Sequence, residues 1–200
     1  ASGARAIYPV GSMEEAVRLG QNLDRPDRLL CGERRGVRIE GFDLGNSPLE
    51  FTPDAVGDRA LVMATTNGTP ALVAASSAQR TLAASYLNLA AVYDSIAGED
   101  AVAIVCAGRE KRFALEDAVC AGLLADRLLG DSPRDDGLND GASAALALAE
   151  RYRDDLAGMM KNTTAGRQLI EIGHLEDLIF CARLDHLDVV PRLEERRITA

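Results

Sequence analysis

Cys106 and Arg112 have the residue types and the spacing to cleave a phosphate ester. In cysteine-dependent phosphatases a thiolate with a lowered pKa attacks phosphorus, while loop N–H groups and an arginine hold the phosphate. On this hypothesis Cys106 is the nucleophile, Arg112 is the phosphate clamp and no metal takes part. However, residues 107–111 include only one glycine, and Val105 stands where these enzymes have a histidine. A buried cysteine at the end of a strand is the alternative interpretation.

The stretch "TTNGT" at 65–69 could bind an anion. An apolar run precedes it and Pro70 follows, a pattern typical of a strand, a tight turn and the first turn of a helix. We expect Thr69 to cap that helix and Pro70 to be its first residue. Asn67 and Gly68 would form the turn and leave N–H groups free at the positive end of the helix, where a phosphate can bind. An ordinary strand-to-helix turn would explain the same spacing.

Carboxylates form the third group of candidate residues. Glu33 and Asp43 flank the exit of a predicted strand, and Glu116 and Asp117 lie in the first turn of a predicted helix. Mg²⁺ prefers one or two carboxylates together with water and substrate phosphate. We therefore assign Glu33, Asp43 and Glu116 to a metal and Asp117 to catalysis. The alternative for each of them is an ordinary solvated acidic side chain.

The elements that must position these residues alternate between short apolar runs and helical patterns. Such alternation predicts a layered α/β/α fold with a largely parallel sheet, and the C-terminal third is helical. The expected strands are Ala6–Val10, Arg28–Gly32, Arg59–Ala64, Arg80–Ala84 and Ala101–Cys106. The expected helices run from Ser12 to about Leu23 and over Ala71–Ser76, Leu89–Ile96, Ala114–Leu129, Ala142–Met160, Arg167–Ile172 and Glu176–Leu184.

Length and composition limit the possible functions. The 200 residues, 47% of them hydrophobic, suffice for a single domain over 1–200, with a polar stretch at 130–140 as a possible mobile loop. A net charge of −9 argues against nucleic acid and anionic membrane partners. The four cysteines form no C-x-x-C pair. With no apolar run long enough to span a membrane, the sequence predicts a cytoplasmic protein that binds a small molecule and could form a homo-oligomer.

Several blocks together resemble one family, the 2-phosphosulfolactate phosphatases of coenzyme M biosynthesis. The matching segments extend over nearly the whole chain and occur in the same order. They are Gly32-Glu33-Arg34, "IEGFDLGNSPLEFTP" (39–53), "TTNGT" (65–69), "CAGREKRFALEDAVCAGLLADRLL" (106–129) and "EDLIFCARLDHLDVVP" (176–191). The resemblance implies an α/β fold and Mg²⁺-dependent hydrolysis of a phosphate monoester that also carries a sulfonate, with a 2-hydroxy sulfonic acid as product.

Two departures from the family pattern concern its anion-binding residues. Pro70 stands where the family usually has an arginine, so one candidate donor for sulfonate or phosphate is absent. The family also begins with a strand and an Asp-Val-Leu-Arg-Ala-Thr/Ser-Thr-like segment that has no counterpart before Ala1. We therefore expect the domain to lack this N-terminal strand segment.

The leading hypothesis is a Mg²⁺-dependent phosphatase that acts on 2-phosphosulfolactate or a related small phosphorylated acid. One alternative is the metal-independent cysteine phosphatase, and another is an anion-binding homologue without catalysis. The residues expected to hold the two anionic groups of the substrate are Asn46, Ser47, Thr65, Thr66, Asn67, Gly68, Thr69, Ser85 and Asn88.

Overall fold

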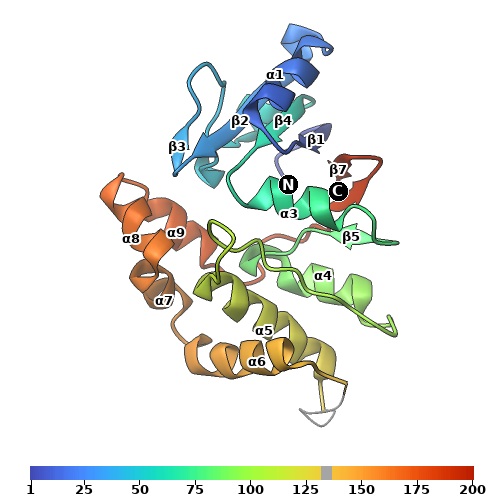
Figure 1. The fold of residues 1–200 in the computed structure, drawn as a ribbon, viewed down its shortest axis with the longest axis vertical. Coiled ribbons are helices and arrows are strands. Elements are labelled where there is room, and N and C mark those ends of the chain that lie inside the picture. Colours follow the sequence, from blue (N-terminus) through green and yellow to red (C-terminus); the bar gives the residue numbers. More distant parts are fainter. Residues whose placement is uncertain (132–136) are drawn as a thin grey trace. The chain divides into compact units, whose positions relative to one another are not determined.

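A computed structural model of the chain describes residues 1–131 and 137–200 (Figure 1). Part of the predicted loop at 130–140, residues 132–136, lies outside the described residues. The chain forms two compact units. Unit 1 contains Ala1–Ala83 and Pro191–Ala200, and unit 2 contains Ala84–Val190.

Unit 1 contains a seven-stranded mixed sheet in the order β3-β2-β4-β1-β7-β6-β5. Strands β2, β4 and β1 pair in parallel, and the other neighbours pair antiparallel. The α/β prediction is thus confirmed, and the predicted parallel pairing holds for these three strands. The strands are β1 (Ala6–Pro9), β2 (Arg28–Arg34), β3 (Val37–Arg38), β4 (Ala60–Ala64), β5 (Thr81–Leu82), β6 (Arg192–Glu194) and β7 (Arg197–Thr199).

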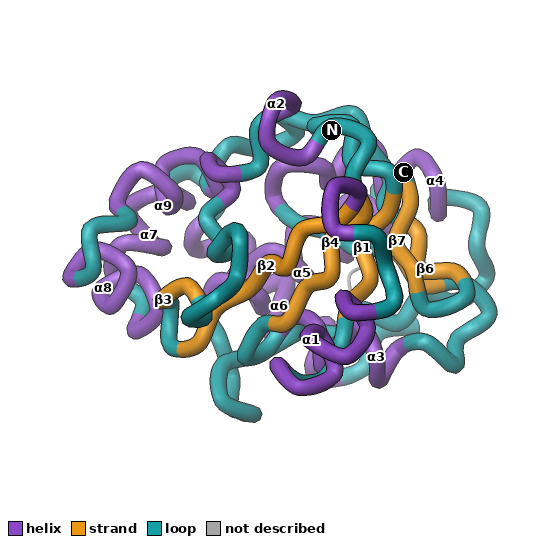
Figure 2. Tube along the Cα trace, turned by 90° about the horizontal axis from the view of Figure 1, so that it is seen from above, coloured by secondary structure: helices purple, strands orange, loops and turns teal. Residues whose placement is uncertain are grey.

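The parallel strands bury both of their faces, as their continuous apolar runs require. Leu30 and Val62 are register partners and belong to one core cluster, which also contains Ala16 of helix α1 (Met13–Gln21). Leu61 belongs to a second cluster with Val56 of the short helix α2 (Pro53–Val56). Figure 2 shows α1 and α2 on opposite sides of these strands. The site residues that follow β2 and β4 are therefore anchored to strands buried on both faces.

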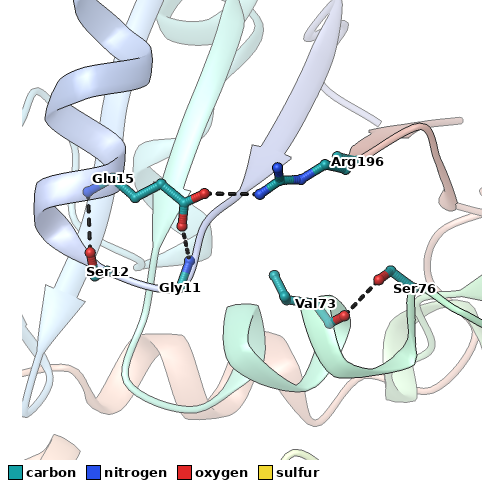
Figure 3. Close-up of polar contacts among 6 residues, drawn as sticks. All are labelled: Gly11, Ser12, Glu15, Val73, Ser76 and Arg196. Carbon is teal, nitrogen blue, oxygen red and sulfur yellow. Dashed lines mark hydrogen bonds and ion pairs between the residues drawn. The ribbon is translucent and has the colours of Figure 1, made fainter.

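Helix α1 begins as the sequence predicts. The Ser12 hydroxyl accepts a hydrogen bond from the N–H of Glu15 at 3.1 Å, and the Glu15 carboxylate accepts one from the N–H of Gly11 at 2.9 Å (Figure 3). Arg196, in the turn between β6 and β7, donates to the other oxygen of Glu15 at 2.9 Å. These contacts fix the N-terminus of α1 against the sheet, where a side-chain cap satisfies N–H groups that have no helical acceptor.

The other helix of unit 1 is α3 (Gly68–Ala75), which contacts β1. Unit 2 is built from helices α4 (Leu89–Ile96), α5 (Leu115–Leu129), α6 (Asp140–Tyr152), α7 (Leu156–Asn162), α8 (Thr164–Glu171) and α9 (Leu175–Cys181). Short 3₁₀ turns cover Arg25–Asp27, Pro48–Glu50 and Tyr86–Asn88. Figure 1 shows α5 and α6 side by side, and Gly122 makes their close packing possible: a Cβ there would lie 2.0 Å from the carbonyl oxygen of Ala145.

Two predicted elements of unit 2 are wrong. The single helix expected at Ala142–Met160 is split into α6 and α7, because the Asp155 carboxylate accepts the N–H of Gly158 at 2.8 Å and starts a new helix. The strand expected at Ala101–Cys106 is not formed. A strand needs backbone partners, and within the described part of the chain no backbone hydrogen bond reaches 101–107. Val105 in this segment is 65% exposed.

No helix within residues 1–131 and 137–200 has the length and apolar character needed to cross a membrane.

Candidate active site

The turn at 65–69 is fixed by Glu33, which lies near the end of β2. One Glu33 oxygen accepts the N–H of Thr66 at 2.7 Å, and the other accepts the N–H of Gly36 at 2.8 Å. The Thr66 hydroxyl also donates to Glu33 at 3.3 Å. Glu33 is only 7% exposed, so these are buried charge-assisted bonds. The structure therefore brings two predicted site residues together, with Glu33 positioning the turn.

Thr65 and Thr69 close the same turn from within. The Thr65 hydroxyl accepts the N–H of Thr69 at 2.9 Å, and the Thr69 hydroxyl accepts the N–H of Thr65 at 3.0 Å. Helix α3 begins at Gly68, and Thr69 lies inside the helix. The prediction that Thr69 caps a helix starting at Pro70 is therefore wrong. Pro70 is tolerated in the first turn because N–H groups there have no helical acceptor. Among the described residues, none accepts the N–H of Gly68.

Asp43, Asn46 and Ser47 lie in the long loop that follows β3. Asp43 accepts the N–H of Leu30 at 2.8 Å, which ties the loop to β2. The buried Ser47 accepts the N–H of Leu49 at 3.3 Å, and Asn46 is exposed. Asp43 and Asn46 are both exposed, whereas Ser47 is buried.

Ser85 and Asn88 belong to unit 2 and bond each other. The Asn88 amide oxygen accepts from the N–H of Ser85 at 2.8 Å and from its hydroxyl at 3.1 Å, while the Asn88 amide nitrogen donates to the carbonyl of Val189 at 3.0 Å. Asn88 is 4% exposed. Its contacts hold together two distant segments of unit 2, so its observed role is structural.

The remaining candidates meet in unit 2 where α5 begins. Asp117, in the first turn of α5, accepts the N–H of Gly108 at 2.7 Å. The backbones of Arg109 and Arg112 then bond each other in both directions, at 3.0 and 2.9 Å. Gly108 has φ +70°, and a Cβ there would lie 2.6 Å from the carbonyl oxygen of Arg112. The result is a tight hairpin turn, held against a carboxylate.

The electrostatics of this turn oppose a nucleophilic cysteine. Desolvation, assisted by the negative charge of Asp117, raises the pKa of the Cys106 thiol. The cysteine hypothesis requires a lowered pKa, so the direction of this shift does not support it. Arg112 is exposed, and its backbone N–H bonds Arg109. The predicted loop cradle between Cys106 and Arg112 is a hairpin instead.

Glu116 and Asp117 are half-buried carboxylates on adjacent positions of α5. Desolvation raises the pKa of Glu116, and the charge of Asp117 adds to this effect while Arg109 reduces it. Desolvation also raises the pKa of Asp117, against the bond from Gly108. The ionised pair is thus unfavourable by itself, and a cation would stabilise it.

The donor set at Glu116 and Asp117 fits Mg²⁺, which takes one or two carboxylates and completes its shell with water and phosphate. In the parts of the chain that the structure describes, no three His, Cys, Asp or Glu side chains converge on one point. Glu33 and Asp43 lie in unit 1 and already accept backbone N–H groups. Their metal role stays a prediction, and their observed contacts are those of positioning residues.

Sequence reasoning missed the part played by Arg109. Its Nη2 donates to the side-chain oxygen of Gln168 in α8 at 2.6 Å. Helices α5, α6 and α7 lie between Arg109 and Gln168 along the chain, so no local pattern could have paired them. The only available signal was the arginine's position after a predicted strand.

Comparisons with known proteins give the family of the chain. A sequence model of the 2-phosphosulpholactate phosphatase family matches residues 1–196. A probable 2-phosphosulfolactate phosphatase of Caldanaerobacter subterraneus subsp. tengcongensis is 40% identical over 195 residues, which cover 96% of this chain and 80% of that protein. Proteins of the same name from Synechococcus sp. (strain JA-2-3B'a(2-13)) and Symbiobacterium thermophilum are 42% identical (96% of this chain, 80% of theirs) and 41% identical (99% and 85%). The chain therefore belongs to the 2-phosphosulpholactate phosphatase family.

Proposed function

We propose that this chain hydrolyses 2-phosphosulfolactate, or a closely related small phosphorylated acid, to the 2-hydroxy acid and phosphate, with Mg²⁺ as cofactor. The observation that carries the proposal is the family match over residues 1–196. Relatives about 40% identical over nearly the whole chain carry the name of this activity. The two groups of predicted site residues in the structure have the chemistry that such a reaction needs.

In unit 1 the turn at 65–69 supports anion binding. Glu33 and the Thr65–Thr69 pair hold the turn in place, so the N–H of Gly68 needs no reorganisation when an anion arrives. The N–H of Gly68 lies at the start of α3, where the helix dipole favours negative charge. We assign this turn of unit 1 to anion binding.

In unit 2 we assign the metal to Glu116 and Asp117. Mg²⁺ bound there would polarise a phosphoryl oxygen and lower the pKa of a water molecule. Asp117 keeps one oxygen on the N–H of Gly108, which fixes the direction of its carboxylate. Tyr86 donates its hydroxyl proton to the backbone carbonyl of Glu116 at 2.6 Å and so holds the first turn of α5 in place. These contacts hold the Asp117 carboxylate and the backbone of Glu116 in place before any ligand binds.

Phosphate release from racemic 2-phosphosulfolactate tests the proposal, measured with Mg²⁺ and with excess EDTA. We expect release with Mg²⁺, loss of release with EDTA and recovery when Mg²⁺ is restored. Phospholactate, which has the same phosphate without the sulfonate, is the matched substrate and should react more slowly. Release that is unaffected by EDTA would remove the metal from the proposal.

Two variants separate the remaining possibilities. Glu116→Gln should lower release about 100-fold by removing a ligand charge. Cys106→Ser should leave release nearly unchanged, whereas the cysteine alternative requires that it abolish turnover. Calorimetric binding of 2-phosphosulfolactate without any release would instead support the non-catalytic alternative.

A further inference from the structure

Arg109 is a cation of unit 2 that is restrained at both ends of its side chain. The hairpin bonds between Arg109 and Arg112 fix its backbone, and Gly108 anchors the start of the hairpin to Asp117. The Gln168 side chain holds the Nη2 end of the guanidinium at 2.6 Å. Both the base and the tip of this side chain are therefore restrained.

One donor of this restrained guanidinium has no acceptor. Nη1 of Arg109 is buried, and within the described residues it has no hydrogen-bond partner. Arginine stays charged in proteins, and a buried donor without an acceptor costs free energy, more when the donor is charged. The neutral amide oxygen of Gln168 accepts from Nη2, and Nη1 remains available for a further acceptor.

The charges around Arg109 indicate what that acceptor is. The charge of Arg109 acts on Glu116, where it opposes the rise in pKa, yet no hydrogen bond or ion pair joins the two side chains within the described residues. Arg109 is thus not neutralised by this carboxylate. A phosphate oxygen is an acceptor of the kind that Nη1 lacks, because charged N–H groups form strong hydrogen bonds with phosphate.

We propose that Arg109 binds the phosphoryl group of the substrate, with Gln168 as the residue that positions it. This inference rests on the proposed function for the identity of the substrate, but the interaction with phosphate is a separate property. It also differs from the sequence-based hypothesis, which gave the phosphate clamp to Arg112. The exposed Arg112 side chain has no comparable restraint.

Equilibrium binding of inorganic phosphate to the full chain tests the inference, measured by calorimetry with Mg²⁺ present. Arg109→Gln should weaken binding about 10- to 100-fold, as expected for losing charged hydrogen bonds. Arg109→Lys keeps the charge but loses the planar guanidinium, so it should weaken phosphate binding less than Arg109→Gln does. In the hydrolysis assay it should lower kcat more than the loss of a surface charge would. Lys111→Gln, in the exposed part of the same hairpin, is the matched control and should change binding less than about twofold.

The urea unfolding midpoint of each variant shows whether it is folded. If Arg109→Gln is not folded, Arg109→Lys replaces it in the binding test. Phosphate binding by Arg109→Gln as tight as that of Lys111→Gln would overturn the inference, and so would no phosphate binding by the unmodified chain. Arg109-dependent binding without hydrolysis of 2-phosphosulfolactate would uphold the inference while the proposed function fails. Hydrolysis of 2-phosphosulfolactate together with phosphate binding that does not depend on Arg109 would overturn the inference while the proposed function holds.

Discussion

At the scale of single residues, Glu33 does the work of a backbone acceptor. Its carboxylate accepts the N–H groups of Gly36, in the turn between β2 and β3, and of Thr66, which follows β4. An amide in its place has one oxygen and one NH₂ group, so one backbone N–H would face another donor. Acidic residues after strands can be recognised in a sequence as candidate ligands, but this use of the charge depends on a contact 33 residues away.

We expect Glu33→Gln to lower the free energy of unfolding by about 1–3 kcal/mol, because a buried donor loses its acceptor. Urea denaturation measures this, and Glu40→Gln is the matched control because Glu40 is exposed on the following loop. Phosphate release should also fall, since the turn at 65–69 loses its restraint. Equal midpoints for Glu33→Gln and Glu40→Gln would show that Glu33 does not hold the turn.

Glu116 predicts a pH-dependent effect on stability. Desolvation raises its pKa in the folded chain above the ordinary value of 4.5, so ionisation costs more in the folded state than in the unfolded state. Glu116→Gln removes this cost. Without Mg²⁺ the variant should therefore be more stable than the unmodified chain at neutral pH, and the difference should shrink as the pH falls through the raised pKa and vanish below about 4.5. Urea midpoints at several pH values measure it, and a difference that grows toward acid would contradict the assignment.

At the scale of elements, the cap of α1 shows what local sequence can determine. The Ser12 hydroxyl bonds the N–H of Glu15, and both residues were identifiable as a capping pair. Ser12→Ala should lower the free energy of unfolding by about 1 kcal/mol. Ser77→Ala, at an exposed position after α3, is the control in the same urea measurement and should have little effect. A cost of Ser12→Ala no larger than that of the control would mean that α1 does not depend on its cap.

The effect of replacing Gly122 depends on the packing of two helices and not on local sequence. In a free helix, replacing glycine with alanine stabilises by about 1 kcal/mol. In this chain the added Cβ would lie 2.0 Å from the carbonyl oxygen of Ala145, so α5 and α6 would have to move apart. We expect Gly122→Ala to lower the thermal midpoint, with a net cost of about 1–3 kcal/mol. A raised midpoint would show that the two helices separate at little cost.

The contrast between these two positions shows how far the sequence predicts the fold. Caps and apolar periodicity act within a few residues, so α1, α5 and the parallel strands were predictable. Pairing acts over long distances, so the apolar run at 101–106 predicted a strand that has no backbone partner in the described parts of the chain. The break at Asp155 was missed because apolar spacing continues across it. Among site residues, the 65–69 turn was identified from its composition, whereas the Glu33 and Gln168 contacts required the tertiary structure.

At the scale of the whole molecule, the net charge of the chain has the same sign as the substrate proposed for its candidate site. The net charge is −9, yet the proposed substrate is an anion. Long-range steering by the whole protein would therefore not attract it, and screening at physiological ionic strength limits this repulsion to about 8 Å. Binding must come from local groups, which in unit 2 are Arg109 and a cation held by Glu116 and Asp117.

Thermal unfolding of the full chain tests this dependence on a bound cation. A ligand that binds only the folded state stabilises it by mass action, by about 2.7 kcal/mol at a concentration 100 times its dissociation constant. We expect Mg²⁺ with inorganic phosphate to raise the midpoint by several degrees and EDTA to reverse the effect. Mg²⁺ alone should raise it less, because phosphate completes the metal's shell and engages Arg109. Glu116→Gln should lose most of the response to Mg²⁺, since the metal has lost a ligand. A full response in Glu116→Gln would place the cation elsewhere, and Glu33 and Asp43 would then be the carboxylates to replace next.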